Sequence, residues 1–131
     1  VSSHTLGSED VMRLLSQWLR DQVGSEPFPF TSISLNKNYA ASRHRDRNNV
    51  GPSALRSVGD CRGGQLRYWG GAAANMPLAD LDNADSVLLD ARHAVAFFDG
   101  NRPHAVERYV GERFSIVFFT AGGYRRTSAD V

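Results

Sequence analysis

An imidazole and a carboxylate stand two residues apart in His44-Arg45-Asp46. On an extended segment such residues point to the same face, so both can bind one ion. A second histidine that opens a later strand would complete a set of two imidazoles and one carboxylate. Such a set leaves the remaining coordination positions of a metal such as Fe(II) open. The sequence offers His93 and His104 for this role.

The choice between the two histidines depends on a cationic side chain nearby. A 2-oxoacid can chelate a metal through its keto and C1-carboxylate oxygens, and a second, distal carboxylate is then matched best by the two parallel donors of an arginine. The sequence Val110-Gly111-Glu112 predicts a tight turn, so residues 104–109 and 112–120 should pair as a hairpin. In that register His104 and Arg113 face the same side.

The residues around Arg113 support the same choice. Ser115 points the same way as Arg113, and its hydroxyl can donate to the same carboxylate. His93 is also followed nine residues later by an arginine, but Arg102 lies in a turn-like segment rather than on a strand. We therefore predict that His104, rather than His93, completes the metal site.

Four short motifs that contain these residues follow one another in a fixed order: His44-x-Asp46, Gly63-Gly64-x-Leu66, Phe98-x-Gly100 with Pro103-His104, and Gly111-x-Arg113-x-Ser115. This set covers roughly residues 31–120 and resembles the iron(II)/2-oxoglutarate dioxygenase superfamily. The resemblance implies that His44, Asp46 and His104 bind Fe(II). It also implies that Arg113 and Ser115 bind the distal carboxylate of 2-oxoglutarate.

The same resemblance implies a reaction and further contacts. Enzymes of this superfamily use O2 to decarboxylate 2-oxoglutarate oxidatively and hydroxylate a C–H bond of a main substrate, with release of succinate and CO2. In relatives, a polar residue or a tyrosine shortly before the His-x-Asp motif often contacts the co-substrate. Tyr39 is the first candidate for this contact, and Asn36 and Asn38 are the others. These motifs do not specify the main substrate.

A closer similarity to the nucleobase oxidases of the ten-eleven-translocation and base-J-binding-protein group rests on the arginines around the iron motif. Arg43, Arg45 and Arg47 interleave with His44 and Asp46, and three arginines at a pocket mouth suit the phosphates that flank a flipped base. The alternative is that they are solvated loop residues in an arginine-rich chain. Two further alternatives are a hydroxylase of protein side chains and a non-catalytic, small-molecule-binding jelly roll.

Two kinds of secondary structure must position these residues. From Ser8 to near Val23-Gly24, apolar residues recur at helical spacing and predict an amphipathic supporting helix. After residue 30, short runs separated by Gly, Asn, Asp and Pro clusters predict eight strands, near 31–37, 40–45, 53–59, 64–69, 86–90, 94–99, 104–109 and 112–120. Gly70 to Asp85 is predicted to be a long loop. This order predicts a mainly β jelly roll, which the resemblance specifies as a double-stranded β-helix.

Length and composition exclude several classes of protein. The 131 residues, 41% of them hydrophobic, suit one folded domain over 1–131 and exclude wholesale disorder. A net charge of +1 excludes an overall polycation that would bind nucleic acid or membranes by charge alone.

The only cysteine, Cys61, cannot form an internal disulfide, and no apolar run reaches the roughly 20 residues of a membrane span. The start at Val1 shows no secretion signal and indicates a processed chain or an excised domain. We expect an intracellular protein, cytoplasmic or nuclear, with no membrane partner.

Overall fold

The computed structural model describes residues 9–24 and 27–122. Within these residues the chain forms the helix α2 (Glu9–Val23), nine strands and two short 3-10 helices. The strands are β1 (Ser32–Lys37), β2 (Pro52–Val58), β3 (Cys61–Gly63), β4 (Leu66–Tyr68), β5 (Val87–Leu89), β6 (Ala96–Asp99), β7 (His104–Val106), β8 (Tyr109–Gly111) and β9 (Phe114–Phe119). The 3-10 helices, η1 (Leu78–Asp80) and η2 (Asn83–Asp85), lie in the predicted long loop. The predicted mainly β class with an N-terminal helix is confirmed.

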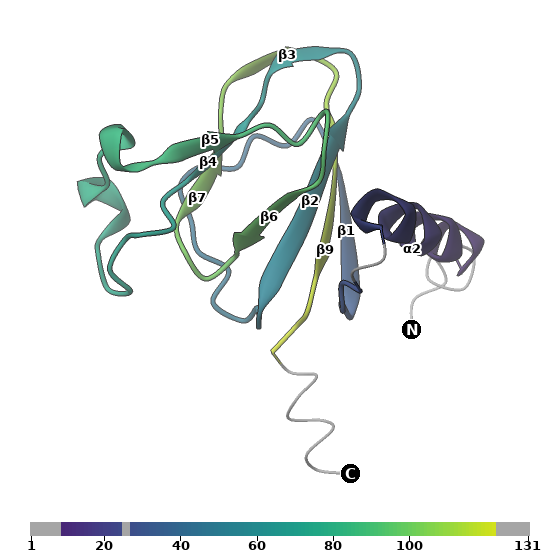
Figure 1. Ribbon diagram of the computed structural model, residues 1–131. Coiled ribbons are helices and arrows are strands. Elements are labelled where there is room, and N and C mark those ends of the chain that lie inside the picture. The colour runs from purple at the N-terminus through teal and green to yellow at the C-terminus, as the bar shows by residue number, and fades with distance from the viewer. Residues whose placement is uncertain (1–8, 25–26, 123–131) are drawn as a thin grey trace.

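Two antiparallel sheets lie on opposite sides of the molecule's interior (Figure 1). The larger sheet has the strand order β1-β9-β2-β6, and the smaller has the order β5-β4-β7. Strands β3 and β8 form a separate two-stranded ladder at one end. Because β6 belongs to the larger sheet and β7 to the smaller, the chain crosses between the sheets. This is the double-sheet arrangement of the predicted jelly roll.

Strand β9 lies inside the larger sheet, between β1 and β2, and both of its faces are covered. Ile116 and Phe118 pack on the face that carries the helix. Ser115 and Val117 line the space between the sheets. Successive side chains of a strand point to opposite faces, so a strand covered on both sides has no position where a charged group stays in water. This explains the uncharged sequence FSIVFF of β9.

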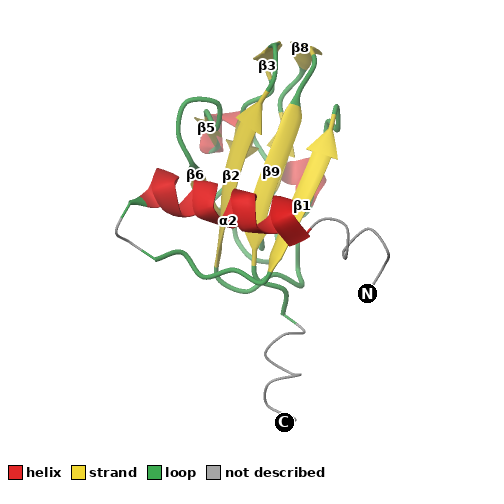
Figure 2. Cartoon of the chain, turned by 90° about the vertical axis from the view of Figure 1, so that its right-hand side faces the viewer, coloured by secondary structure: helices red, strands yellow, loops and turns green. Residues whose placement is uncertain are grey.

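Helix α2 runs across the outer face of the larger sheet, over β2, β9 and β1 (Figure 2). Leu19 is 1% exposed and packs in one cluster with Ala54 of β2 and Phe118 of β9, and Leu15 and Trp18 join this cluster. Burial of a leucine side chain contributes roughly 1.5–3 kcal/mol, so the helix is bound to the sheet by its apolar face. Within the described residues, no helix has both the length and the apolar composition needed to cross a bilayer.

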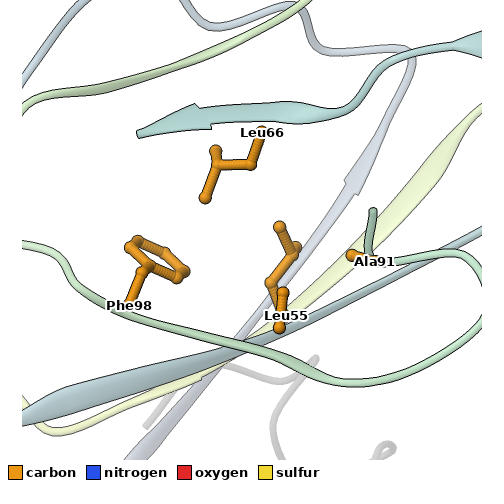
Figure 3. Close-up of a cluster of buried hydrophobic side chains, with 5 residues drawn as sticks. Leu55, Leu66, Ala91 and Phe98 are labelled. Atoms are coloured by element: carbon orange, nitrogen blue, oxygen red, sulfur yellow. The ribbon is translucent and has the colours of Figure 1, made fainter. Parts of the chain in front are cut away.

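A second apolar cluster joins the two sheets (Figure 3). Leu66 of the smaller sheet points toward Leu55 and Phe98 of the larger sheet, and Ala91 closes one side. Leu55, Leu66 and Phe98 also line the pocket that lies between the sheets. The inter-sheet core is therefore one wall of the candidate site.

Two expectations about strands are wrong. The segment 40–45 is not a strand, because it forms only an isolated bridge, from His44 to His104 of β7. The predicted hairpin between residues 104–109 and 112–120 does not form either. Strand β7 pairs with β4, whereas β9 pairs with β1 and β2 in the opposite sheet. The turn residue Gly111 belongs to β8, which pairs with β3. A local turn signal therefore did not decide which strands became neighbours.

Candidate metal centre

Three side chains that can bind a metal converge beside the start of β7. One ligand atom each from His44, Asp46 and His104 lies within 4.8 Å of the other two. Nε2 of His44 is 3.6 Å from Oδ1 of Asp46, and Nε2 of His104 is 3.2 Å from Oδ2. Ligand atoms bound at right angles to one divalent cation, each about 2.1 Å from it, lie about 3 Å apart. Small shifts would therefore place all three atoms on one ion.

The backbone determines which nitrogen of each imidazole is free. Nδ1 of His44 is 2.7 Å from the carbonyl oxygen of Ser42, and Nδ1 of His104 is 2.8 Å from that of Arg102. Because a carbonyl oxygen only accepts, each Nδ1–H donates, and in the neutral imidazole each Nε2 is then the nitrogen that can bind a metal. Outer hydrogen bonds of this kind orient histidine ligands in metal sites. The donor set and its support fit a divalent metal such as Fe(II).

Backbone pairing holds the two histidines opposite each other. The N–H of His44 donates to the carbonyl of His104 at 3.1 Å, the N–H of His104 donates back at 3.0 Å, and the rings are 4.2 Å apart. The N–H of Asp46 donates to the carbonyl of Gly100 at 2.7 Å, which ties the carboxylate segment to the connection between β6 and β7. His104 itself follows the fully buried Pro103. The site therefore forms where an irregular segment lies along the start of a strand.

The carboxylate of Asp46 is held in its ionised form. When the imidazoles are protonated, a hydrogen bond with His104 lowers the pKa of Asp46, and the charges of His104 and His44 act in the same direction, while partial burial opposes them. A carboxylate must be deprotonated to bind a metal. The site thus presents Asp46 in its metal-binding form at neutral pH.

The three candidate ligands open into a pocket of about 350 Å³ between the two sheets. Arg113, which directly precedes β9, and Ser115 within it line the same pocket and are 2% and 7% exposed. The apolar part of the lining comes from both sheets and includes Leu66 and Val117. The structure therefore brings the predicted ligands and the predicted carboxylate-binding residues into one pocket. It does so from opposite sheets rather than along a hairpin.

Arg113 is buried without an anionic partner. Among residues 9–24 and 27–122, no carboxylate forms a salt bridge with Arg113, and its buried Nε has no hydrogen-bond partner. Burial lowers the pKa of Arg113, and Cys61 and Tyr109 oppose this change. An arginine nonetheless stays protonated in proteins. Since a buried, unpaired charge is unfavourable, this end of the pocket is suited to an anion.

The structure separates the three candidate residues that precede the metal motif. Asn36 and Tyr39 line the pocket, but Asn38 is not among the lining residues. Asn36 stands opposite Ser115 in the pairing of β1 with β9. Tyr39 is 60% exposed and lies where the pocket meets solvent. Asn38 contacts the backbone of Arg113 instead, accepting a hydrogen bond from its N–H at 2.8 Å.

Ser34 is a polar pocket residue that the sequence analysis missed. It lies on β1 two residues before Asn36, and the amide of Asn36 donates to its hydroxyl at 3.1 Å. Alternate residues of a strand share a face. Ser34 could therefore have been predicted from the sequence, because it lies two residues before the candidate Asn36 on the same predicted strand.

The alternative histidine and its arginine lie elsewhere. The side chain of His93 is 81% exposed, and its Nδ1 is 3.0 Å from a carboxylate oxygen of Asp90. Arg102 donates to a backbone carbonyl of the loop after β4, at 2.7 Å. Neither residue lines the pocket. The structure brings His104, and not His93, beside His44.

Two of the three arginines around the metal motif hold a loop in place. Arg43 donates to two backbone carbonyls of the Gly70–Asp85 loop at 2.9 and 3.0 Å, and Arg45 donates to two others at 2.8 and 3.3 Å. Arg47 is exposed. For Arg43 and Arg45 both earlier interpretations, phosphate contact and a solvated loop residue, are corrected, because each of these side chains donates to carbonyl oxygens of the loop.

Comparison with solved structures identifies the fold. No family model matches the chain, and no curated protein matches its sequence. The structure of NgTET1 in complex with 5mC DNA matches with a TM-score of 0.52 and 22% identity, over 70% of this chain and 34% of that one. An oxidoreductase of the 2OG-Fe(II) oxygenase family from Burkholderia pseudomallei matches with a TM-score of 0.55 and 19% identity, over 86% of this chain and 55% of that one. The chain has the fold of the 2OG-Fe(II) oxygenases.

The fold implied by the sequence motifs is therefore confirmed. This chain spans about a third of the NgTET1 chain and about half of the Burkholderia oxidoreductase. Identities of 19% and 22% establish the fold, whereas the reaction depends on the residues in the pocket.

Proposed function

We propose that this chain is an Fe(II)- and 2-oxoglutarate-dependent dioxygenase, with residues 1–131 as a single catalytic domain. The observation that carries the proposal is the presence, in one pocket, of the donors His44, Asp46 and His104 together with the buried side chain of Arg113, which forms no salt bridge within the described residues. A pocket that binds only a metal has no need of a buried cation. A co-substrate that chelates the metal at one end and has a free carboxylate at the other needs both.

The metal end of the pocket uses two imidazole nitrogens and one carboxylate oxygen. His44, Asp46 and His104 would hold Fe(II) and leave the remaining coordination positions open. Bound Fe(II) supplies O2 activation, coupled to oxidative decarboxylation of 2-oxoglutarate to succinate and CO2 and to hydroxylation of a substrate C–H bond. The chain keeps the donors in place through the backbone carbonyls that accept from both Nδ1–H groups.

The other end of the pocket would bind the distal carboxylate of 2-oxoglutarate. Arg113 would donate two parallel hydrogen bonds, and the hydroxyl of Ser115 would donate a third. Asn36, opposite Ser115, lines the same pocket. Because Arg113 and Ser115 are buried, these hydrogen bonds would form in a low-dielectric environment, where they are stronger than in water.

Apolar side chains line the pocket between its two ends. Leu55 and Val117 come from the larger sheet, and Leu66 and Val106 come from the smaller one. Walls of this kind limit the access of water to the reacting atoms. Tyr39, at the solvent side of the pocket, is placed to contact a molecule that enters.

Release of succinate without added substrate tests the proposal. Protein loaded anaerobically with Fe(II) and 2-oxoglutarate, then exposed to O2, is expected to form succinate above the rate of free iron. Asp46→Ala should reduce succinate to that background. His93→Ala, which removes a histidine exposed outside the pocket, is the matched control and should keep full release. Binding of Fe(II) with no succinate, even with DNA, RNA and peptide pools present, would indicate a non-catalytic binding protein and overturn the proposal.

A second candidate function concerns the main substrate, which we propose is a nucleobase. The likeness to NgTET1, whose structure is a complex with 5mC DNA, supports this proposal. Arg43 and Arg45 donate to the Gly70–Asp85 loop. Of the three arginines around the His44-x-Asp46 motif, the exposed Arg47 would therefore contact phosphates. DNA or RNA oligonucleotides should increase succinate release, and Arg47→Ala should weaken that stimulation. Stimulation by peptides alone would instead favour a hydroxylase of protein side chains.

A further inference from the structure

The buried side chain of Arg113 fits against a residue that has no side chain. Gly64, in the connection between β3 and β4, is buried, and its φ is +78°. A β-carbon at this position would lie 2.9 Å from both Cδ and Nε of Arg113. Carbon and nitrogen atoms that are not bonded to each other prefer separations of about 3.5–4.0 Å. Any larger residue at position 64 therefore forces the arginine to move.

Tyr109 of β8 lies beside both Gly64 and Arg113. Its Cβ would lie 3.4 Å from a β-carbon at Gly64, and the centre of its ring is 6.0 Å from the guanidinium carbon of Arg113. The arginine side chain thus lies against the bare backbone of Gly64, with the tyrosine next to both residues. Because Arg113 also lines the pocket, displacement of its stem from Gly64 would change where the guanidinium lies in that pocket.

Asn38 holds the backbone of Arg113 from the other side. The N–H of Asn38 donates to the carbonyl of Arg113 at 2.7 Å, and the N–H of Arg113 donates to Oδ1 of Asn38 at 2.8 Å. Asn38 makes this two-point contact with a left-handed backbone, at a φ of +54°. Asparagine tolerates that conformation better than most residues with a side chain.

We propose that Gly64 and Asn38 are positioning residues that direct the guanidinium of Arg113 at the distal carboxylate of the co-substrate. Gly64 provides the space for the arginine stem, and Asn38 fixes the backbone from which the stem begins. This inference rests on the proposed function and deepens it. Neither residue lines the pocket.

The ratio of two affinities tests the proposal. 2-Oxoglutarate and 2-oxobutyrate share the oxoacid group that chelates the metal, but 2-oxobutyrate lacks the distal carboxylate. Both dissociation constants are measured by calorimetry on protein loaded anaerobically with Fe(II). Wild-type protein should bind 2-oxoglutarate at least about tenfold more tightly, as expected when a charged hydrogen bond is present for one ligand only. Gly64→Ala should remove most of that preference while affinity for 2-oxobutyrate stays within about twofold.

Gly63→Ala is the matched control. Gly63 also has a positive φ, of +82°, but a β-carbon there would collide with the backbone carbonyl of Arg108 rather than with Arg113. The Gly63→Ala variant should have a lower melting temperature than the wild-type protein and the same ratio of the two affinities. A purely structural role of Gly64 would give the same result in Gly64→Ala.

Asn38→Gly keeps the inference testable if Gly64→Ala fails to fold. Glycine adopts the left-handed backbone freely and removes only the side-chain acceptor, so the ratio should fall by a smaller factor, about threefold. An unchanged ratio in the variants that fold, with wild-type preference intact, would overturn this inference alone. A wild-type protein that binds Fe(II) but neither 2-oxoacid would overturn the proposed function instead.

Discussion

Replacement of Arg113 by methionine is predicted to make the ligand-free protein more stable and its co-substrate binding weaker. Methionine keeps an unbranched apolar stem but removes the charge. Arg113 is 2% exposed, and within the described residues its Nε has no partner. A buried polar group left without a hydrogen bond costs about 1–3 kcal/mol. Removing the charge should therefore stabilise the ligand-free chain by about 1 kcal/mol, or about 4 °C in melting temperature for a domain of this size.

The same substitution removes the hydrogen bonds to the distal carboxylate. A hydrogen bond that involves a charged group contributes about 1.5–3 kcal/mol, so the affinity for 2-oxoglutarate should fall by about ten- to a hundredfold. Iron affinity should change little, because Arg113 provides no ligand atom. A ligand that binds only the folded state raises the melting temperature of the protein. Addition of Fe(II) and 2-oxoglutarate should therefore raise the melting temperature of the wild-type protein. In Arg113→Met, 2-oxoglutarate should no longer contribute to this rise.

Thermal melts with and without the co-substrate, together with calorimetry of 2-oxoglutarate binding, measure both effects. Arg113→Lys is the control, because it keeps the charge but not the paired donors, and it should fall between the other two proteins in affinity. A destabilised ligand-free Arg113→Met would show that the guanidinium supports the fold. Unchanged 2-oxoglutarate affinity would show that another group binds the carboxylate. Either result would refute the reasoning.

Three further predictions concern the metal ligands and the helix. His44→Ala and Asp46→Ala should each abolish Fe(II) binding in anaerobic calorimetry, since each removes one of three ligand atoms; full occupancy in both would exclude this site. His104→Ala should lose metal and succinate production while His93→Ala keeps both, and the reverse pattern would mean that His93 is the third ligand. Leu19→Ala should lower the free energy of unfolding in urea by about 2–5 kcal/mol, because it leaves a cavity between α2 and the larger sheet; a loss below about 1 kcal/mol would show that the helix contributes little.

The chemistry of the candidate site could be predicted because it depends on residue types. Two imidazoles, a carboxylate and an arginine followed by a serine limit the ligands that a pocket can bind, wherever the chain places them. The helix was predictable for a related reason, since apolar residues at helical spacing must be buried on one face. The helical pattern and each separate motif of the site are local in the sequence, although the motifs lie far apart along the chain.

The partners of the strands were not predictable in the same way. The turn at Val110-Gly111-Glu112 was a sound local signal, yet β7 and β9 lie in different sheets. Backbone hydrogen bonds are the same for any pair of strands, so pairing is decided by which faces become buried. His104 and Arg113 therefore share a pocket for a reason other than the predicted one: they face each other across the interior.

The sequence by itself determined the candidate donor set of this protein, the uncharged strand β9 and the supporting helix, because each follows from residue type and local pattern. Only the tertiary structure decided that Arg43 and Arg45 hold a loop, that Asn38 supports the backbone of Arg113, and that Gly64 makes room for its side chain. Each of these contacts joins residues more than 25 positions apart. Hydrogen bonds and close packing act over a few ångströms in space, whatever the separation along the chain.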